Sequence, residues 1–436
     1  MPAARTTSKA RRTNLRVPAS SFVGRRDELL AIVDAFEVAR LVTLVGPGGM
    51  GKTRLAIEHA RARLDSLARR GRGGVWIVEL AEARSAEDAM AEVARVLEVP
   101  LAGRASERER SEEIARAIAR LGPVLVVLDD LERIATPAAR LLAHWLSLAP
   151  SARFLVTSRI ALGLPEERTL TVGSLGPSDA RTLFLDRAAQ VRVMATSESE
   201  PGLVERIVDA IDRMPLAIEL AASRTRVLST KELSARLDRP LALLSGGVVR
   251  ERHASVRGAV LDSLALLDPP ARRAFALLAS VDDGFALDTA EAVLSPLCTG
   301  DVTPLETLEA LVRTSLVRVE AGTDPTRYAL FATIREVAEG LFDEEPLRHQ
   351  ACIAHAEHHL RLVRAARAGG VAEEARIARD LEHFLRARTT AISLGRAHDA
   401  VELTLAVEPV LARRGLSSQR ASLVDEALTS IAPSDD

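Results

Sequence analysis

Residues 46–53 form the segment of this sequence best equipped for chemistry. They read GPGGMGKT, which satisfies the pattern G-x-x-x-x-G-K-[ST]. Such glycines let the backbone curl so that successive N–H groups point at phosphate oxygens, and a helix starting near Thr53 adds its positive end. The Lys52 ammonium would bridge the β and γ phosphates, and the Thr53 hydroxyl would complete the coordination of Mg²⁺. The motif therefore predicts a site for ATP or ADP with Mg²⁺.

Lysine is rare in this chain, which makes its presence in the motif informative. It occurs only at Lys9, Lys52 and Lys231, whereas arginine is used almost everywhere else. A compact ammonium suits a position between phosphates better than a broad guanidinium does. The nucleotide-binding set that we expect from this loop is Gly46, Gly48, Gly49, Met50, Gly51, Lys52, Thr53 and Arg54.

Two acidic residues follow an apolar run at 124–128. Asp129 is expected to hold the Mg²⁺ together with Thr53, in part through water. Asp130 would orient or deprotonate the attacking water, and Glu132 is a weaker candidate for this task. The alternative is that these acids only begin a loop or cap a helix.

Another apolar run ends in a cation. Residues 154–159 read FLVTSR, so Arg159 is expected at the tip of a strand, where its guanidinium could sense the γ phosphate. A surface ion pair is the alternative role for this arginine. The predicted catalytic set is therefore Lys52, Asp130 and Arg159.

Alternating strands and helices must hold these groups in place. Short runs that are apolar throughout are typical of parallel strands buried on both faces. They occur at 41–45, 75–80, 124–128 and 154–157, with a fifth candidate at 169–172. Helical patterns lie between them at 53–69, 86–97 and 106–121. This alternation predicts an α/β P-loop domain with a parallel sheet.

Helical periodicity takes over after about residue 175. Extended runs at 316–320 and 327–331, separated by a turn, follow several helices and indicate a winged helix. The last 90 or so residues are rich in Ala, Leu and Arg and look like helical hairpins of the tetratricopeptide kind. The expected division is a basic flexible tail, a nucleotide-binding domain, a helical domain, a winged helix and a helical-hairpin region, at 1–19, 20–175, 176–245, 246–343 and 344–436.

Composition places the 436-residue chain among ordinary soluble proteins. It is 47% apolar and 27% charged with a net charge of -2, so no overall field would gather nucleic acid or anionic membrane. No apolar run approaches the roughly 18 to 20 residues that span a bilayer. Only Cys298 and Cys352 are present, which fits a reducing cytoplasm. The basic first 20 residues are interpreted as a flexible tail, with a transit peptide or a nucleic-acid-binding arm as alternatives.

Segments on either side of the P-loop give the sequence a resemblance to a known family. Residues 22–25 read FVGR and residues 214–220 read MPLAIEL. Together with the P-loop and the strands ending in Asp129 and Arg159, they resemble the NB-ARC class of STAND ATPases. The likeness is strongest to bacterial regulators that join this ATPase to a winged helix and helical repeats, and it spans residues 20 to about 431.

The resemblance implies several roles. Val23, Gly24 and Arg25 would lie against the adenine and ribose, and Pro215 would close over the base from the helical domain. The protein would be a slow, switch-type ATP hydrolase acting in signal transduction, in which ADP holds a closed form and ATP an open, often oligomeric one. Its C-terminal helices would engage a protein partner, and its place would be the cytoplasm.

The sequence departs from that family at two places. The usual G-L-P-L reads Arg213-Met214-Pro215-Leu216 here, which predicts a looser approach of the backbone to the base. Many relatives carry Met-His-Asp in the winged helix, and the matching positions here are Leu330, Phe331 and Ala332. An ADP lock would then need other residues.

Other functions and sites stay open as less favoured alternatives. The winged helix could bind DNA, since its helices carry several arginines, although acids are interleaved with them. A nucleotide-bound scaffold with little hydrolysis is a further possibility. Finally, His349, Cys352, His355, His358 and His359 recur at helical spacing and could hold a metal, but we interpret them as a solvated helix face.

Overall fold

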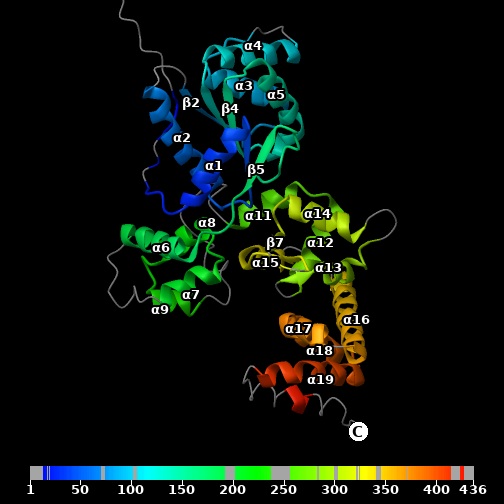
Figure 1. Cartoon of the computed structure of the whole chain (residues 1–436). Helices are drawn as coiled ribbons and strands as arrows, with labels where there is room; N and C mark the ends of the chain where they lie inside the picture. Colours follow the sequence, from blue (N-terminus) through cyan, green and yellow to red (C-terminus); the bar gives the residue numbers. More distant parts are fainter. Residues whose placement is uncertain are drawn as a thin grey trace, which may run out of the picture. The chain divides into compact units, whose positions relative to one another are not determined.

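The structure is a computed structural model of the chain (Figure 1). It describes residues 13–16, 18, 20–69, 74–101, 106–191, 202–236, 256–281, 284–298, 303–320, 323, 325–339, 345–369, 371–413 and 423–426. Two compact units are present. Unit 1 is Met1–Leu266 with Arg313–Ser315, and unit 2 is Leu267–Val312 with Leu316–Asp436.

A parallel sheet forms the centre of unit 1. Its strands are β1 (Leu41–Val45), β2 (Gly74–Glu79), β3 (Val124–Asp129), β4 (Ala152–Ser158) and β5 (Glu167–Thr171). Within the described residues their order is β2-β3-β4-β1-β5, and every pairing is parallel. The predicted α/β class with a parallel sheet is confirmed. Because all strands run the same way, the residues after β1, β3 and β4 meet at one edge.

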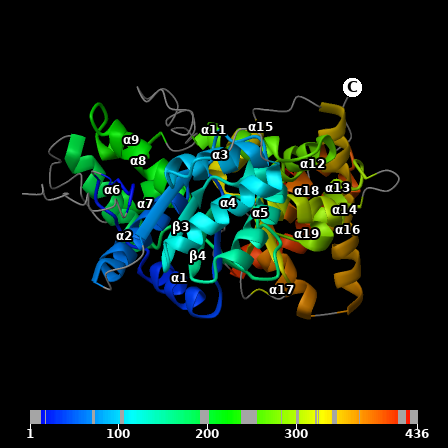
Figure 2. The same ribbon diagram turned by 90° about the horizontal axis from the view of Figure 1, so that it is seen from above.

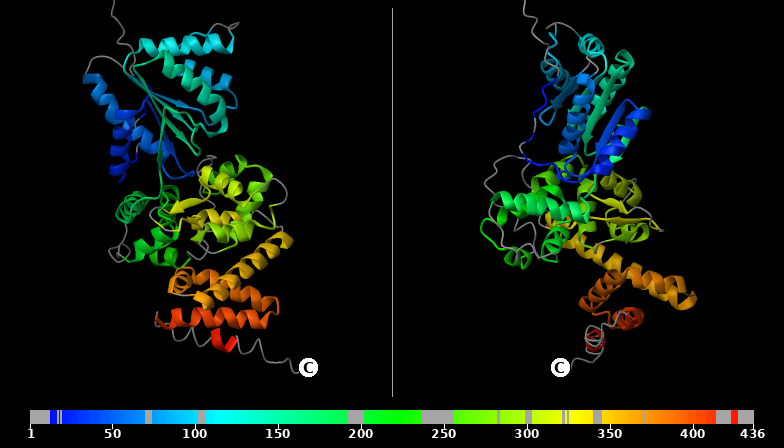
Figure 3. Two further views of the ribbon diagram at one scale, coloured as in Figure 1. Left: turned by 45° about the vertical axis from the view of Figure 1, so that its right-hand side comes forward. Right: turned by 60° about the vertical axis from the view of Figure 1, so that its left-hand side comes forward.

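Helices cover both faces of this sheet (Figures 2 and 3). On one face, alternate strand residues such as Val126 and Phe154 pack against Trp145. The helices of that layer are α3 (Ala86–Val96), α4 (Glu107–Arg120) and α5 (Ala135–Leu148), preceded by the short η1 (Glu132–Ile134). The other face carries α1 (Arg26–Val38) and α2 (Lys52–Arg69). Trp76 and Trp145 are both buried, as a core role predicts.

Capping side chains mark the first residues of α3 and α4. The Ser85 hydroxyl accepts from the Asp88 N–H at the start of α3. Ser106 and Glu109 form a reciprocal capping box on α4. Each cap satisfies N–H groups that the first helical turn cannot pair internally.

Unit 1 continues with a group of helices that follow the sheet. They are α6 (Pro177–Val191), α7 (Leu203–Ala210), α8 (Pro215–Arg224), α9 (Thr230–Ser234) and α11 (Val256–Ala265). Pro215 occupies the first turn of α8, where its missing N–H costs nothing and its fixed φ favours the helix. Apolar side chains such as Phe184, Ile207 and Ile218 are buried in this group.

Unit 2 begins with α12 (Pro269–Ala279), β6 (Phe285–Ala286), α13 (Leu287–Leu294), α14 (Pro304–Arg313), β7 (Arg318–Glu320), β8 (Arg327–Ala329) and α15 (Ala332–Glu339). The strands pair antiparallel in the order β6-β8-β7, so the predicted hairpin exists and gains a third short strand. The remaining helices are α16 (Glu345–Gly369), α17 (Val371–Arg379), α18 (Leu381–Ser393) and α19 (Ala397–Arg413). Across the described residues, no helix is both long and apolar enough to traverse a bilayer.

The histidines of α16 correct one interpretation made from the sequence. His349 is exposed, as a solvated face requires. His355, His358 and His359 are instead 1%, 7% and 0% exposed. The solvated-face interpretation is therefore wrong for these three, because α13 and α18 pack against α16 and cover them. Helical spacing alone could not reveal this, since α16 is long and its polar and apolar positions are mixed.

Candidate functional site

The loop between β1 and α2 has the backbone geometry of a phosphate cradle. Gly49 and Gly51 adopt φ values of 84° and 83°, which only glycine reaches without strain. A Cβ at Gly46 would lie 2.4 Å from the Val172 carbonyl oxygen, so the loop also needs glycine for a close approach to the chain after β5. The sequence predicted this curled loop from residue types alone.

Lys52 begins α2 and is buried beneath the loop. Its Nζ donates to the carbonyl oxygens of Gly46 at 2.7 Å and Pro47 at 2.9 Å. Burial lowers the pKa of Lys52 to about 8, and the neighbouring Glu132 carboxylate offsets part of this effect. A buried ammonium whose pKa is lowered by burial favours the arrival of a phosphate, because the added negative charge stabilises the protonated form.

The predicted magnesium ligands lie together at the ends of β3 and α2. Asp129 is 6% exposed, and its carboxylate accepts hydrogen bonds from the hydroxyls of Thr157 and Thr53. Burial, and then the charge of Asp130, raise the pKa of Asp129 to about 7. A carboxylate that is costly to ionise beside a threonine hydroxyl is the donor set that a hard cation would stabilise. The residues therefore fit Mg²⁺ bound by Thr53 and Asp129.

Asp130 occupies a strained position directly after β3. Its φ is 58°, in the left-handed region that few residues other than glycine adopt. The backbone N–H donates to Thr157 Oγ1 at 3.0 Å, which holds this conformation. The turn places Asp130 in the wall of the cavity described below, whereas Asp129 stays behind it. Two adjacent acids thus acquire different surroundings.

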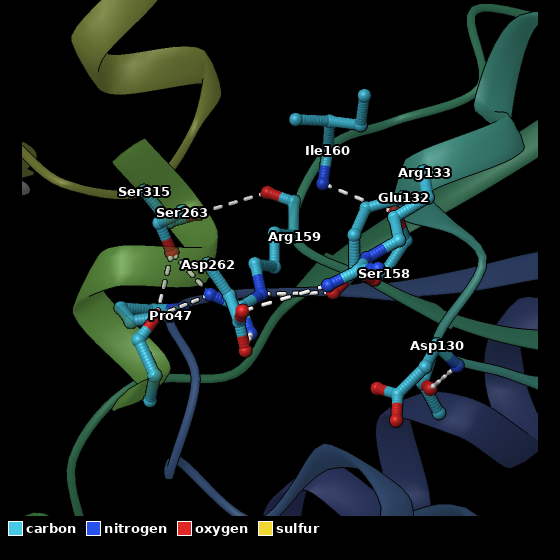
Figure 4. Close-up of polar contacts among 12 residues, drawn as sticks. Pro47, Asp130, Glu132, Arg133, Ser158, Arg159, Ile160, Asp262, Ser263 and Ser315 are labelled. Atoms are coloured by element: carbon cyan, nitrogen blue, oxygen red, sulfur yellow. Dashed lines mark hydrogen bonds and ion pairs between the residues drawn. The ribbon is translucent and has the colours of Figure 1, made fainter. Parts of the chain in front are cut away.

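Arg159 follows β4 and is buried, so the surface ion pair considered as an alternative does not describe it. Its Nε donates to Glu132 Oε1 at 2.8 Å, and Nη1 donates to Ser263 Oγ at 2.6 Å and to the Ala259 carbonyl oxygen. Nη2 lies 3.4 Å from a carboxylate oxygen of Asp262 (Figure 4). In this structure the guanidinium is therefore bound to η1 and α11.

Reasoning from the sequence missed the partners of Arg159. From the sequence, Glu132 is a weaker candidate for orienting the attacking water; in the structure its carboxylate forms a buried ion pair with Arg159. Asp262 and Ser263 lie a hundred residues further along the chain, and no local pattern connects them to β4. Ser315 adds a hydrogen bond from its hydroxyl to the Arg159 carbonyl oxygen at 3.1 Å.

A cavity of about 450 Å³ opens over the P-loop, a volume typical of small-molecule sites. Most of the predicted nucleotide-binding and catalytic residues line it. These are Val23, Arg25, Gly48, Gly49, Met50, Gly51, Lys52, Thr53, Arg54, Asp130, Arg159 and Pro215. Gly24, Gly46 and Asp129 lie behind the lining. Gly24 has a φ of 71°, and a Cβ there would meet the Asp179 carboxylate at 2.2 Å.

Two arginines fasten the segment before α1 to the P-loop. The buried Arg25 donates from Nη2 to the carbonyl oxygens of Met50 at 3.0 Å and Gly173 at 2.5 Å. Arg54 donates to the Ser20 carbonyl oxygen at 2.5 Å and lies over the Phe22 ring. Both side chains position the wall of the cavity by binding the protein's own backbone.

The start of α8 forms another wall. The Leu216 N–H donates to the Gly49 carbonyl oxygen at 3.2 Å, so the P-loop is bonded directly to α8. Arg213, which stands where the resembling family has glycine, adopts a φ of 51°. The backbone conformation that glycine would give is thus retained at a cost of about 1 kcal/mol. The looser approach of the backbone to the base stays a prediction.

Phe331, at the position of the missing histidine, is a buried residue of unit 2. Its ring lies 4.7 Å from the guanidinium carbon of Arg318. The ring therefore has a packing role in its own unit, which explains why an aromatic is accommodated there.

A mycobacterial relative matches about four fifths of this chain. The uncharacterized protein Rv0894 of Mycobacterium tuberculosis is 33% identical over 364 residues, which cover 81% of this chain and 89% of that protein. The chain belongs to the family of that protein. Residues 36–168 of this chain match the AAA domain family, and this range contains the P-loop, Asp129, Asp130 and Arg159.

Two further proteins, one compared by sequence and one by structure, are similar to this chain. The M. tuberculosis protein named "Putative HTH-type transcriptional regulator Rv0890c" is 35% identical over 303 residues, 69% of this chain but only 33% of that protein. The chain thus spans about a third of the length of that relative. The Walker-type ATPase of Pyrococcus abyssi has 15% identity and a TM-score of 0.51 over 74% of this chain and 99% of that one, which shows a shared fold.

The P-loop ATPase class predicted from the sequence is therefore confirmed at the level of the AAA domain. The finer assignment to the NB-ARC class stays a prediction. The residue roles also remain predictions, although the structure brings all of their carriers to one edge of the sheet or to the cavity above it.

Proposed function

We propose that this protein is an ATP-driven molecular switch that hydrolyses ATP slowly and couples the identity of the bound nucleotide to the position of α11. The observation that carries the proposal is the double role of Arg159. Its side chain lines the cavity, yet its hydrogen bonds go to Glu132 and to α11. One cation is thus shared by the nucleotide site and a helix that leads into unit 2.

The cavity supports Mg²⁺-ATP and Mg²⁺-ADP as ligands. The P-loop N–H groups and Lys52 would bind the phosphates, and Thr53 and Asp129 would hold the Mg²⁺, which spreads the phosphate charge. Asp130 would orient the attacking water. Val23 and Pro215 would border the base, in keeping with the resemblance to NB-ARC ATPases.

α11 lies where a γ phosphate would alter its contacts. A Cβ placed on Gly48 would be 2.7 Å from Ala259 Cβ, so α11 touches the P-loop itself. A γ phosphate would compete for the guanidinium of Arg159 with Ser263, Asp262 and the Ala259 carbonyl. ADP lacks that phosphate and would leave these contacts in place. A ligand shifts a conformational equilibrium only through such a difference in binding free energy.

The segments that contain the partners of Arg159 continue directly into unit 2, so a change in these contacts would act on the chain that enters unit 2. α11 ends at Ala265, and the chain enters unit 2 at Leu267. Ser315, which donates to the Arg159 carbonyl oxygen, is the last residue before the chain enters unit 2 again at Leu316. Arg159 therefore contacts the chain next to two of its passages between the units.

Hydrogen–deuterium exchange on the full-length protein tests the proposal. The amides of α11 should exchange faster with Mg²⁺ and a non-hydrolysable ATP analogue than with Mg²⁺-ADP. Ser263→Ala should raise exchange in the ADP state, and Ser147→Ala, at an exposed serine of α5, is the control. Equal α11 exchange with both nucleotides would contradict the switch, and failure of either nucleotide to bind would contradict the ATPase itself.

The biological setting is proposed to be regulation of transcription or stress signalling, because the 35% identical relative is named as a regulator. We further propose that the ATP form assembles into homo-oligomers and that the C-terminal helices bind a protein partner. Direct DNA binding is the second candidate, favoured only by the HTH-type name of that relative. Equilibrium binding to duplex DNA across a salt titration tests it, since phosphate contacts give a steep linear dependence of log affinity on log salt.

A further inference from the structure

Three histidines of unit 2 meet in its interior, away from any role in nucleotide binding proposed above. His355 and His359 are one turn apart on α16, and His383 comes from α18. Their exposed fractions are 1%, 0% and 2%. One ring nitrogen from each can be chosen so that all three lie within 4.8 Å of one another.

The rings face one another closely. His355 Nε2 and His383 Nδ1 share a hydrogen bond of 3.1 Å, which a bound metal would replace, and the ring centroids of His355 and His359 are 4.2 Å apart. His359 and His383 are stacked, with their planes 5° apart. In a tetrahedral site with metal–nitrogen bonds of about 2.0 to 2.1 Å, ligand nitrogens are separated by roughly 3.3 Å. Small ring movements would bring the cluster to that spacing.

Two buried nitrogens of this cluster accept or donate nothing within the described residues. They are His355 Nδ1 and His359 Nε2. His359 Nδ1, in contrast, lies 2.9 Å from the His355 carbonyl oxygen, to which its N–H can donate. This bond fixes the ring and leaves the Nε2 lone pair directed away from its own helix, the arrangement usual for a metal-bound histidine. A buried polar atom without a partner is unfavourable unless a ligand satisfies it.

We propose that His355, His359 and His383 bind a first-row transition-metal dication, with Zn²⁺ as the leading candidate. Imidazole nitrogens suit Zn²⁺, Co²⁺, Ni²⁺ and Cu²⁺, and the absence of an acid among the three ligands disfavours Mg²⁺ and Ca²⁺. The metal would tie α16 to α18 and so stabilise the helical part of unit 2. Water or another small ligand would complete the coordination.

His358 is the neighbour that the proposal leaves outside the site. Its ring meets His359 edge-on at 5.1 Å between centroids, and its Nε2 lies 3.8 Å from Asp288 Oδ2. Asp288 is itself paired with Arg376 at 2.6 Å. Asp288 is thus engaged with other side chains, and His358 borders the site.

Metal titration of the full-length, untagged and nucleotide-free protein tests the proposal. After removal of metals with a chelator, Co²⁺ should bind with one equivalent per chain and produce visible absorption bands of tetrahedral intensity, and Zn²⁺ should displace it. At a Zn²⁺ concentration about 100-fold above the dissociation constant, the melting temperature should rise by about 5 °C. No binding tighter than about 10 μM by the wild-type protein would overturn the proposal, whatever the variants do.

Variants locate the metal within the chain. His383→Phe and His359→Leu, which keep most of the buried volume, should each weaken Co²⁺ binding at least about 10-fold. His349→Gln, at the exposed histidine of the same helix, should bind like the wild type. Unchanged affinity and spectrum in both ligand variants would assign the metal elsewhere and overturn the site. Circular dichroism of each variant before titration checks that it has folded.

Discussion

At the scale of single residues, the AAA domain keeps unlike charges close together and away from water. Lys52, Asp129, Glu132 and Arg159 are all at most 9% exposed. Each charge is stabilised by a neighbour or a hydrogen bond, because an isolated buried charge would be too costly. Removal of one member therefore changes the site more than loss of a surface charge would.

Lys52→Ala should weaken ATP and ADP binding by at least about 100-fold, because a buried, charge-assisted contact with the phosphates is lost. Fluorescence titration with a labelled nucleotide measures this. Lys231→Ala removes an exposed lysine of the same unit and is the matched control. Native affinity in Lys52→Ala would show that nucleotide is not bound at this P-loop.

Asp130→Ala should leave nucleotide binding within a few-fold of wild type and slow hydrolysis by about 10² to 10⁴, the usual contribution of a positioned general base. Phosphate release under saturating Mg²⁺-ATP is the measurement. Asp34→Ala, at an exposed acid of α1, should hydrolyse at the native rate. If Asp130→Ala were also as fast as wild type, the water-positioning role would belong to another residue.

His59 should make unit 1 sensitive to acid. This residue of α2 stacks on Phe36 of α1. Burial, followed by the positive charges of Arg63 and Arg153, lowers the pKa of His59 to about 4. Between pH 6.5 and 4 the unfolded chain binds a proton that the folded chain does not, so stability falls as pH falls through this window, by up to about 3 kcal/mol. His59→Phe should flatten this part of the pH profile in chemical denaturation, and His349→Gln should not. A His59→Phe profile that runs parallel to the wild-type profile from pH 6.5 to 4 would contradict the prediction.

At the scale of elements, α8 and α11 contribute walls to the cavity over the P-loop. The P-loop backbone is bonded to the start of α8 and touches α11. Both helices come from parts of the chain far from β1. The residues just before α8 adopt strained backbone conformations. The contact between α8 and the P-loop offsets the conformational energy of that strain.

The conformational energy of this strain can be measured at Arg213. Its φ of 51° is one that glycine adopts freely, and its ion pair with Asp209 at 3.4 Å is too exposed to matter greatly. Arg213→Gly should therefore be more stable than Arg213→Ala by about 1 kcal/mol, although glycine normally loses to alanine. Urea denaturation of the two variants provides the comparison. The reverse order would mean that the left-handed conformation is not required here.

At the scale of the whole molecule, the chain is a two-unit protein whose AAA domain lies entirely in unit 1. The proposed switch uses the covalent passages next to α11 and Ser315 to reach unit 2. The metal site proposed above would act on unit 2 alone. Nucleotide and metal should therefore stabilise different parts of the protein.

The proposed ATP-dependent assembly is a prediction at this scale. With Mg²⁺ and a non-hydrolysable ATP analogue the sedimentation coefficient should increase, whereas with Mg²⁺-ADP it should remain that of the smaller species. Analytical ultracentrifugation measures both states, and Lys52→Ala should show no increase with either nucleotide. Identical sedimentation of the wild type in the two states would contradict nucleotide-driven assembly.

The sequence by itself determined the features that depend on local chemistry. The glycines and Lys52 specify the P-loop, and apolar runs specify the parallel strands whose ends carry Asp129 and Arg159. The hairpin of unit 2 likewise followed from two extended runs and a turn. These features were predictable because backbone conformation and strand burial are set by residue types within a few positions.

Only the tertiary structure decided which distant side chains became partners. No local pattern indicates that Arg159 binds Ser263 of α11, or that His383 joins His355 and His359. The solvated face predicted for α16 was wrong for His355, His358 and His359, because their burial depends on packing against the separate helices α13 and α18. Side-chain partners across such distances are chosen by packing and by the cost of burying polar groups, and neither is encoded in local periodicity.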